Sequence, residues 1–134
     1  MWKLTFDQKR HTTVIEEPSA SDLSARIGAL DNNDHTFVNL ENDTGQIALS
    51  GGQDGKVMVH CTPDFERGFL VADPLISWDA GTLEMSIQGQ RAEYSKRYFI
   101  SKDSATQAAI YFFVNHSLDD TFLWEVDQDA QLGA

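Results

Sequence analysis

The sequence predicts an α+β fold, a meandering antiparallel sheet of about six or seven strands with two helices packed on it. Short stretches of alternating apolar and polar residues follow one another, and turns rich in glycine, asparagine and aspartate separate them. Two longer stretches, at about residues 19–30 and 103–115, instead carry apolar residues at helical spacing. The length of 134 residues fits one domain, which we expect to span residues 1–134.

The first 30 residues predict a strand followed by a helix. Apolar and polar residues alternate over residues 2–6, which is typical of a half-buried strand, and residues 11–15 extend or repeat it. Pro18 ends this pattern, and Ser19 is a suitable N-cap for the helix that follows. The apolar residues of that helix share one face: Leu23, Ile27 and Leu30.

The middle of the chain predicts the meander of the sheet. Strand character is found at residues 36–41, 46–50 and 56–61, and the turns NDTG and GGQDG separate these strands. Because short turns join neighbouring strands in opposite directions, the sheet should be antiparallel. The single cysteine of the sequence, Cys61, shares a face with Val57 and Val59, so we expect it to be a small core residue.

The C-terminal half completes the predicted sheet and adds the second helix. Extended pieces are expected at residues 69–74, 75–79, 82–88 and 89–100. The apolar face of the following helix consists of Ala105, Ala108, Ala109, Phe112 and Phe113. A last strand at 121–126 places Trp124 in the core, after a turn that contains Asp119 and Asp120. Residues 127–134 are expected to form a solvated tail.

The composition is strongly acidic, with 10 lysine and arginine residues against 21 aspartate and glutamate residues and a net charge of −11. Such a charge repels nucleic acids and anionic membranes and attracts basic proteins. The alternative is that the acidity serves solubility alone. No signal peptide or membrane-spanning run is apparent in the sequence, so we expect a cytoplasmic protein.

The sequence contains no motif that demands catalysis, a metal or a cofactor. The four histidines and the single cysteine lack metal-ligand spacing, and there is no G-x-S-x-G nucleophile motif. The stretch GGQDGK lies between two strands and is expected to be a turn, and adjacent acids are expected to be solvated. Four basic residues are expected to lie on the exposed face of a strand and to balance nearby acids: Arg91, Lys96, Arg97 and Lys102.

The C-terminal third, GQRAEYSKRYFISKDSATQAAIYFFVNHSLDDTFLWE, resembles a bacterial immunity-protein family, the first of the numbered ones, which is often paired with deaminase toxins in polymorphic toxin systems. The likeness is in the order of an extended stretch, an alanine- and aromatic-rich helix, a polar break and a terminal FLWE. Upstream, a helix leading into a meander with a glycine pair also fits the family. The resemblance covers about residues 19–125, apart from residues 62–84.

The resemblance implies an inhibitor, not an enzyme, that binds the toxic domain of a cognate secreted toxin and blocks its active site or its substrate approach. Such toxins often attack nucleic acids and tend to be basic, which suits the acidic charge of this chain. The acids that lie in predicted loops are the candidates for toxin binding: Asp31, Asp34, Glu41, Asp43, Asp54, Asp64, Glu66, Asp79, Asp119 and Asp120. For Asp119 and Asp120, a role as turn residues alone is the favoured alternative.

Two aromatic residues are candidates for the buried anchor of such an interface. Phe65 and Trp78 are each large, flanked by acids and near a loop. The alternative is that both are core residues, and for Trp78 this alternative is favoured.

Two other functions remain open. The first is an acidic secretion chaperone or adaptor that holds an effector. The second is a small enzyme built from scattered acids, which strongly raised carboxyl pKa values would favour.

Overall fold

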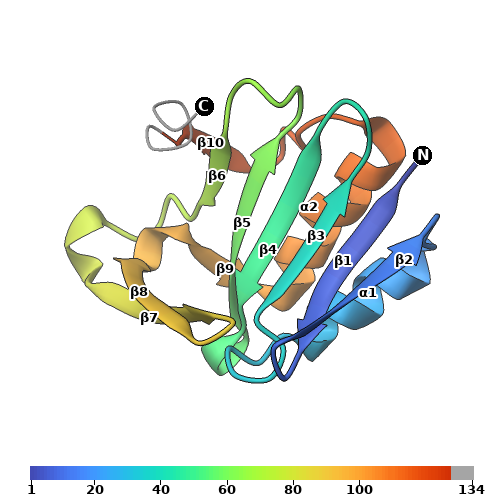
Figure 1. Cartoon of the computed structure of the whole chain (residues 1–134). Helices are drawn as coiled ribbons and strands as arrows, with labels where there is room; N and C mark the ends of the chain where they lie inside the picture. The colour runs from blue at the N-terminus through green and yellow to red at the C-terminus, as the bar shows by residue number, and fades with distance from the viewer. Residues whose placement is uncertain (128–134) are drawn as a thin grey trace.

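The computed structural model describes residues 1–127, and it confirms the α+β fold predicted from the sequence (Figure 1). The helices of this part of the chain are α1 (Ala20–Ala29) and α2 (Lys102–Asn115). Its strands are β1 (Lys3–Gln8), β2 (His11–Glu16), β3 (Phe37–Glu41), β4 (Gln46–Gly51), β5 (Lys56–Thr62), β6 (Phe69–Ala72), β7 (Thr82–Ile87), β8 (Gln90–Ser95), β9 (Phe99–Ser101) and β10 (Leu123–Val126).

Eight of these strands form one antiparallel sheet in the order β10-β6-β5-β4-β3-β1-β2, with β9 paired to β5 beside this path. Strands β7 and β8 form a separate hairpin. The predicted number of strands in the sheet, about six or seven, was therefore too low. A 3₁₀ turn at Lys96–Tyr98 divides the extended piece expected at residues 89–100 into β8 and β9. The extended piece expected at residues 75–79 is wrong, since a turn and a short 3₁₀ helix at Trp78–Ala80 follow Pro74.

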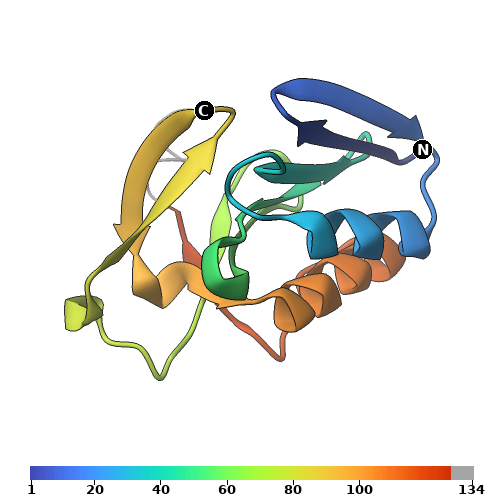
Figure 2. The same ribbon diagram turned by 90° about the horizontal axis from the view of Figure 1, so that it is seen from below.

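Both helices begin at serine caps and agree with their predicted ranges to within one residue. At α1, the Ser19 hydroxyl accepts a hydrogen bond from the backbone N–H of Asp22, and the Asp22 carboxylate accepts one from the Ser19 N–H. At α2, the Ser101 hydroxyl accepts from the backbone N–H of Ser104. The two helices lie side by side on the same face of the sheet (Figure 2).

The main core lies between these helices and the sheet. The predicted faces are buried there, including Val57, Val59 and Cys61 from β5 and the alanines of α2. Small alanine side chains let α2 pack closely against the sheet, while Phe112 fills the space beyond them. Burial raises the pKa of the Cys61 thiol to about 12, with a further contribution from the charge of Asp64.

The β7–β8 hairpin covers part of the opposite face of the sheet. A second buried cluster of Met58, Met85 and Phe99 lies beneath it. The tip of the hairpin meets the β1–β2 turn, where Gly89 leaves room for the guanidinium group of Arg10 (Figure 2). The structure contains no helix in residues 1–127 that is long and apolar enough to cross a membrane.

The tail predicted from residue 127 onward lies outside the described residues except for Asp127. The backbone N–H of Asp127 donates to the carbonyl oxygen of Gly68 at 2.8 Å, and its carboxylate lies 3.1 Å from Nε2 of His60. Asp127 is therefore held against the sheet.

Candidate binding surface

Five of the sequence-predicted residues gather at one end of the sheet, which we call the acidic rim. The β3–β4 turn and the β5–β6 loop lie side by side there (Figure 1), and Gly45 is so close that a Cβ would lie 2.3 Å from the Pro63 carbonyl oxygen. The end of β3 and the two loops together carry the five residues of the rim: Glu41, Asp43, Asp64, Phe65 and Glu66.

Hydrogen bonds from backbone N–H groups to side-chain oxygens fix the shape of both loops. In the β3–β4 turn, the Asn42 side-chain oxygen accepts from the backbone N–H groups of Thr44 at 2.9 Å and Gly45 at 3.1 Å. In the β5–β6 loop, Asp64 Oδ1 accepts from the N–H groups of Glu66 at 2.9 Å and Arg67 at 3.2 Å. These two bonds lower the pKa of Asp64 below its ordinary value, so Asp64 is fully charged at neutral pH.

Phe65 stands out within the acidic rim because it is both exposed and strained. Its side chain is 47 % exposed and belongs to neither buried cluster of the described residues. Its φ of +60° lies in the left-handed region, which costs an L-residue roughly 1–2 kcal/mol. Backbone strain of this kind is concentrated at functional loops. An exposed aromatic side chain in a strained backbone is therefore the best anchor candidate of this surface.

The expectation that Trp78 is a core residue is wrong, since the side chain is 60 % exposed. Its ring packs edge-on against Tyr98 with centroids 5.4 Å apart, and the Arg97 guanidinium carbon lies 5.3 Å from the Trp78 ring centroid. Trp78 and the neighbouring Asp79 lie on the loop between β6 and β7. This loop projects to the left in Figure 1, away from the acidic rim at the top.

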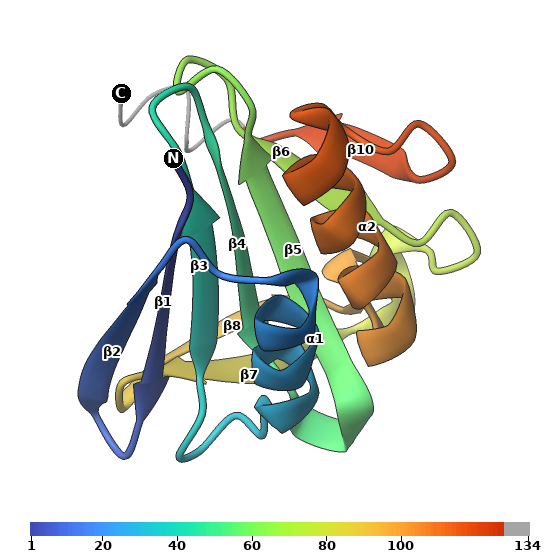
Figure 3. The ribbon, with the colours of Figure 1, turned by 90° about the vertical axis from the view of Figure 1, so that its right-hand side faces the viewer.

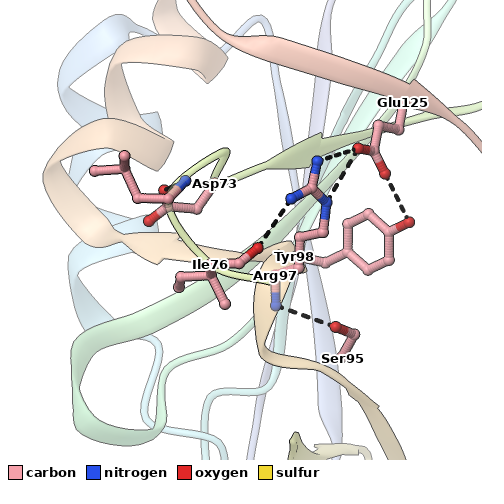
Figure 4. A network of polar contacts seen from close by, with 7 residues as sticks. Asp73, Ile76, Ser95, Arg97, Tyr98 and Glu125 are labelled. Atoms are coloured by element: carbon pink, nitrogen blue, oxygen red, sulfur yellow. Dashed lines mark hydrogen bonds and ion pairs between the residues drawn. The ribbon is translucent and has the colours of Figure 1, made fainter. Parts of the chain in front are cut away.

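Arg97 joins this loop to β10, as Figure 4 shows. Its guanidinium group binds the Glu125 carboxylate and also donates to the Ile76 carbonyl oxygen at 2.9 Å. The Tyr98 hydroxyl donates to the other oxygen of Glu125 at 2.9 Å. The hydrogen bonds from Arg97 lower the pKa of Glu125, while burial and the bond to Glu125 raise the pKa of Tyr98 to about 12. Arg97 thus balances an acid, as expected, but it lies in the 3₁₀ turn at Lys96–Tyr98 and is largely buried, so the expectation that it lies on the exposed face of a strand is wrong.

Three predicted acids lie at the opposite end of the sheet. Asp31 and Asp34 are in the loop between α1 and β3, and Asp54 is in the turn between β4 and β5. Burial alone would raise the pKa of Asp31, but hydrogen bonds from the N–H groups of His35 and Asn33 lower it. The twelve predicted residues therefore do not form one surface.

Asp119 is a structural turn residue and is only 4 % exposed. Its carboxylate accepts hydrogen bonds from the Thr121 N–H and hydroxyl and from the Gln107 amide, and these bonds lower its pKa although burial acts to raise it. Its carbonyl oxygen accepts from Nε1 of Trp124 at 2.8 Å. Trp124 is half-buried and packs against the main core, whereas Asp120 is exposed.

Sequence reasoning missed a groove between the sheet and the β7–β8 hairpin. It encloses about 560 Å³ and is lined by Met58, His60, Leu70, Glu93, Tyr94, Ser95, Tyr98, Val126 and Asp127. Burial lowers the pKa of His60, although Asp127 acts to raise it. Both tyrosines belong to the extended piece expected at residues 89–100, but only the folded structure places Tyr94 on the hairpin and Tyr98 on the following 3₁₀ turn, where both line this groove.

In the described part of the chain, the titratable side chains form no cluster of metal ligands, and the carboxyl pKa values with a resolved shift are all lowered. Within residues 1–127, no group of three or more histidine, cysteine, aspartate or glutamate residues is placed to hold a metal ion. The carboxyl groups with shifted pKa values in this range are Asp31, Asp64, Asp119 and Glu125, and all four shifts are downward. A carboxyl group that acts as a general acid needs the opposite shift.

No known protein family matches the chain, and no curated protein is similar to it.

Proposed function

We propose that this protein is an immunity protein, which binds and neutralises a cognate bacterial toxin domain in the cytoplasm by covering its active site or substrate surface. The observation that carries the proposal is the acidic rim, whose two neighbouring loops bring four acids to the same end of the sheet as an exposed, strained phenylalanine. The toxin is a basic protein that acts on nucleic acid, such as a deaminase or nuclease. This identity of the partner rests on the resemblance in residues 19–61 and 85–125 and on the net charge of −11.

The rim has the two components of a tight protein interface. Carboxylates at the edge of an interface attract a basic partner and speed association, while a buried aromatic residue supplies most of the binding free energy. Both loops of the rim are held by hydrogen bonds before binding, so little conformational entropy is lost on association. Binding needs no cofactor in this proposal.

The test is a binding experiment between the full chain and the toxin domain encoded beside it, at low and at high salt. The proposal predicts a tight complex that forms more slowly as salt rises and that abolishes toxin activity. A complex without loss of toxin activity would contradict inhibition. Binding to an extended effector segment in place of the folded toxin domain would favour the chaperone or adaptor function.

A further inference from the structure

We propose that two copies of this chain pair through their β2 strands, extending the antiparallel sheet across a two-fold axis centred on Val14. The inference does not depend on the proposed function, because it concerns the edge strand β2 and uses no residue of the acidic rim. Strand β2 is the last strand of the sheet and pairs with β1 alone among the described strands. Within residues 1–127 no strand pairs with its outer backbone edge, which ends the sheet (Figure 3), although the Gln88 side chain at the tip of the β7–β8 hairpin donates to the Thr12 hydroxyl at 3.2 Å.

The hairpin register shows which backbone groups of β2 are open. In an antiparallel pair the backbone groups of successive residues point alternately toward the partner strand and away from it. Gln8 and His11 flank the two-residue turn, and the Glu17 N–H donates to the carbonyl oxygen of Trp2. Odd-numbered residues of β2 therefore bond to β1. The outward groups are the N–H and C=O of three residues, Thr12, Val14 and Glu16.

These open groups are self-complementary in one register. When Val14 lies opposite Val14 of a second copy, Thr12 lies opposite Glu16, and all three outward residues of each copy form hydrogen-bonded pairs. If the second strand is displaced by two residues from this register, one of the three outward residues of each copy is left unpaired. The Val14-centred register also separates the two Glu16 carboxylates and brings together two β-branched side chains, each 48 % exposed in the single chain.

The edge carries one of the features that normally prevent such pairing, the charged side chain of Glu16, and lacks the others. Native edge strands commonly carry lysine, proline or a bulge, whereas β2 reads HTTVIE and has regular pairing with β1. The charge distribution also favours this edge for contact between identical chains. Residues 1–17 contain three basic residues (Lys3, Lys9 and Arg10) and three acidic ones (Asp7, Glu16 and Glu17), so this part is neutral. The rest of the chain carries the whole net charge of −11.

The first test is sedimentation equilibrium of the full chain, from micromolar to millimolar concentration, with Val14→Lys and Val114→Lys variants. We expect a reversible dimer that Val14→Lys weakens at least tenfold, because two ammonium groups would meet at the axis. The same substitution at Val114, an exposed residue on α2, should leave the dimer unchanged. Higher salt should strengthen the dimer, since it screens repulsion between two acidic chains, which is opposite to the effect expected for a basic partner.

The second test fixes the register by oxidation of cysteine variants. In a hydrogen-bonded antiparallel pair the Cα atoms are about 5.5 Å apart, within reach of a disulfide. Val14→Cys should therefore form a linked dimer readily, whereas Thr13→Cys, which would lie opposite residue 15, should not. The native Cys61 is buried and serves as the unreactive background. A chain that stays monomeric throughout, a Val14→Lys dimer as strong as the original, or linkage through Thr13→Cys alone would overturn the proposal.

Discussion

The guanidinium group of Arg97 binds one oxygen of Glu125 through two nitrogen atoms, with Nε 3.1 Å and Nη2 2.7 Å from Oε2 (Figure 4). Both side chains are largely buried, so water screens this ion pair less than a surface pair. Because Arg97 also binds the carbonyl oxygen of Ile76, the pair connects β10 to the β6–β7 loop. The edge of the sheet at β10 therefore depends on this contact.

Replacing Glu125 with glutamine should destabilise the fold at neutral pH by about 1–2 kcal/mol, because the amide keeps the shape but loses the charge. The pKa of Glu125 is lowered in the folded state. Its contribution is therefore present above the unfolded-state pKa near 4.5 and is lost as pH falls through the lower folded-state pKa. Urea unfolding of both proteins should give stabilities that converge as pH drops below 4.5. An equal difference at neutral and acidic pH would contradict this account, and Asp79→Asn is the control for an exposed acid.

Asp7 should be far more sensitive to substitution than any acid of the rim. It is 1 % exposed, and its carboxylate accepts hydrogen bonds from the backbone N–H groups of Thr36 and Phe37 and from the Thr36 hydroxyl. Asp7→Ala leaves these buried donors without an acceptor, which should cost about 3 kcal/mol or more of unfolding free energy. Asp43→Asn, at an exposed turn, should change the unfolding free energy by less than about 0.5 kcal/mol. Comparable losses in the two variants would refute the structural role of Asp7.

Phe65 should be a residue that binding needs and folding does not. Phe65→Ala should weaken the complex with the toxin domain by about 2 kcal/mol or more while leaving the unfolding midpoint unchanged. Phe65→Gly should bind equally poorly yet be at least as stable as the original chain, since glycine adopts a positive φ without strain. Calorimetric titration and urea unfolding separate the two effects. Loss of stability in both variants would instead assign Phe65 to the fold.

Asp64 should act on the rate of association. Asp64→Asn removes the charge but keeps the side-chain oxygen that accepts from Glu66 and Arg67, so the loop shape is preserved. We expect a slower association rate, a weaker salt dependence and little change in the dissociation rate by stopped-flow measurement. Asp54→Asn is the matched control, since Asp54 is an exposed acid at the other end of the sheet. Equal effects of the two variants would mean that net charge alone guides association.

The local pattern of the sequence predicts the elements but not how distant segments meet. Both helices could be placed from serine caps and apolar spacing, because these signals lie within a few residues. The grouping of Glu41 with Asp64 requires knowing that β4 and β5 are neighbours and that Gly45 packs against Pro63. The exposure of Trp78 differs from expectation for a similar reason, since aromatic residues are usually buried, and its contacts with Arg97 and Tyr98 come from a distant part of the sequence.

Asn32 shows how one side chain can take the place of a strand partner. Its amide oxygen accepts from the N–H of Ser86 at 2.8 Å, and its amide nitrogen donates to the carbonyl oxygen of Glu84 at 3.2 Å, so it pairs with the free edge of β7. Its φ of +63° suits glycine, which means that Asn32→Gly removes the side chain without straining the backbone.

Loss of these two bonds should loosen the β7–β8 hairpin while the main sheet stays intact. In Asn32→Gly, native-state hydrogen exchange of the Ser86 amide should accelerate about two- to tenfold, the effect of losing one hydrogen bond. The Val59 amide in the buried strand β5 should exchange at its original rate under conditions of local opening. Asn33→Gly controls for added backbone freedom in the same loop, because the neighbouring side chain is exposed. Unchanged exchange at Ser86, or equal acceleration in both variants, would show that the cluster of Met58, Met85 and Phe99 holds the hairpin without help from Asn32.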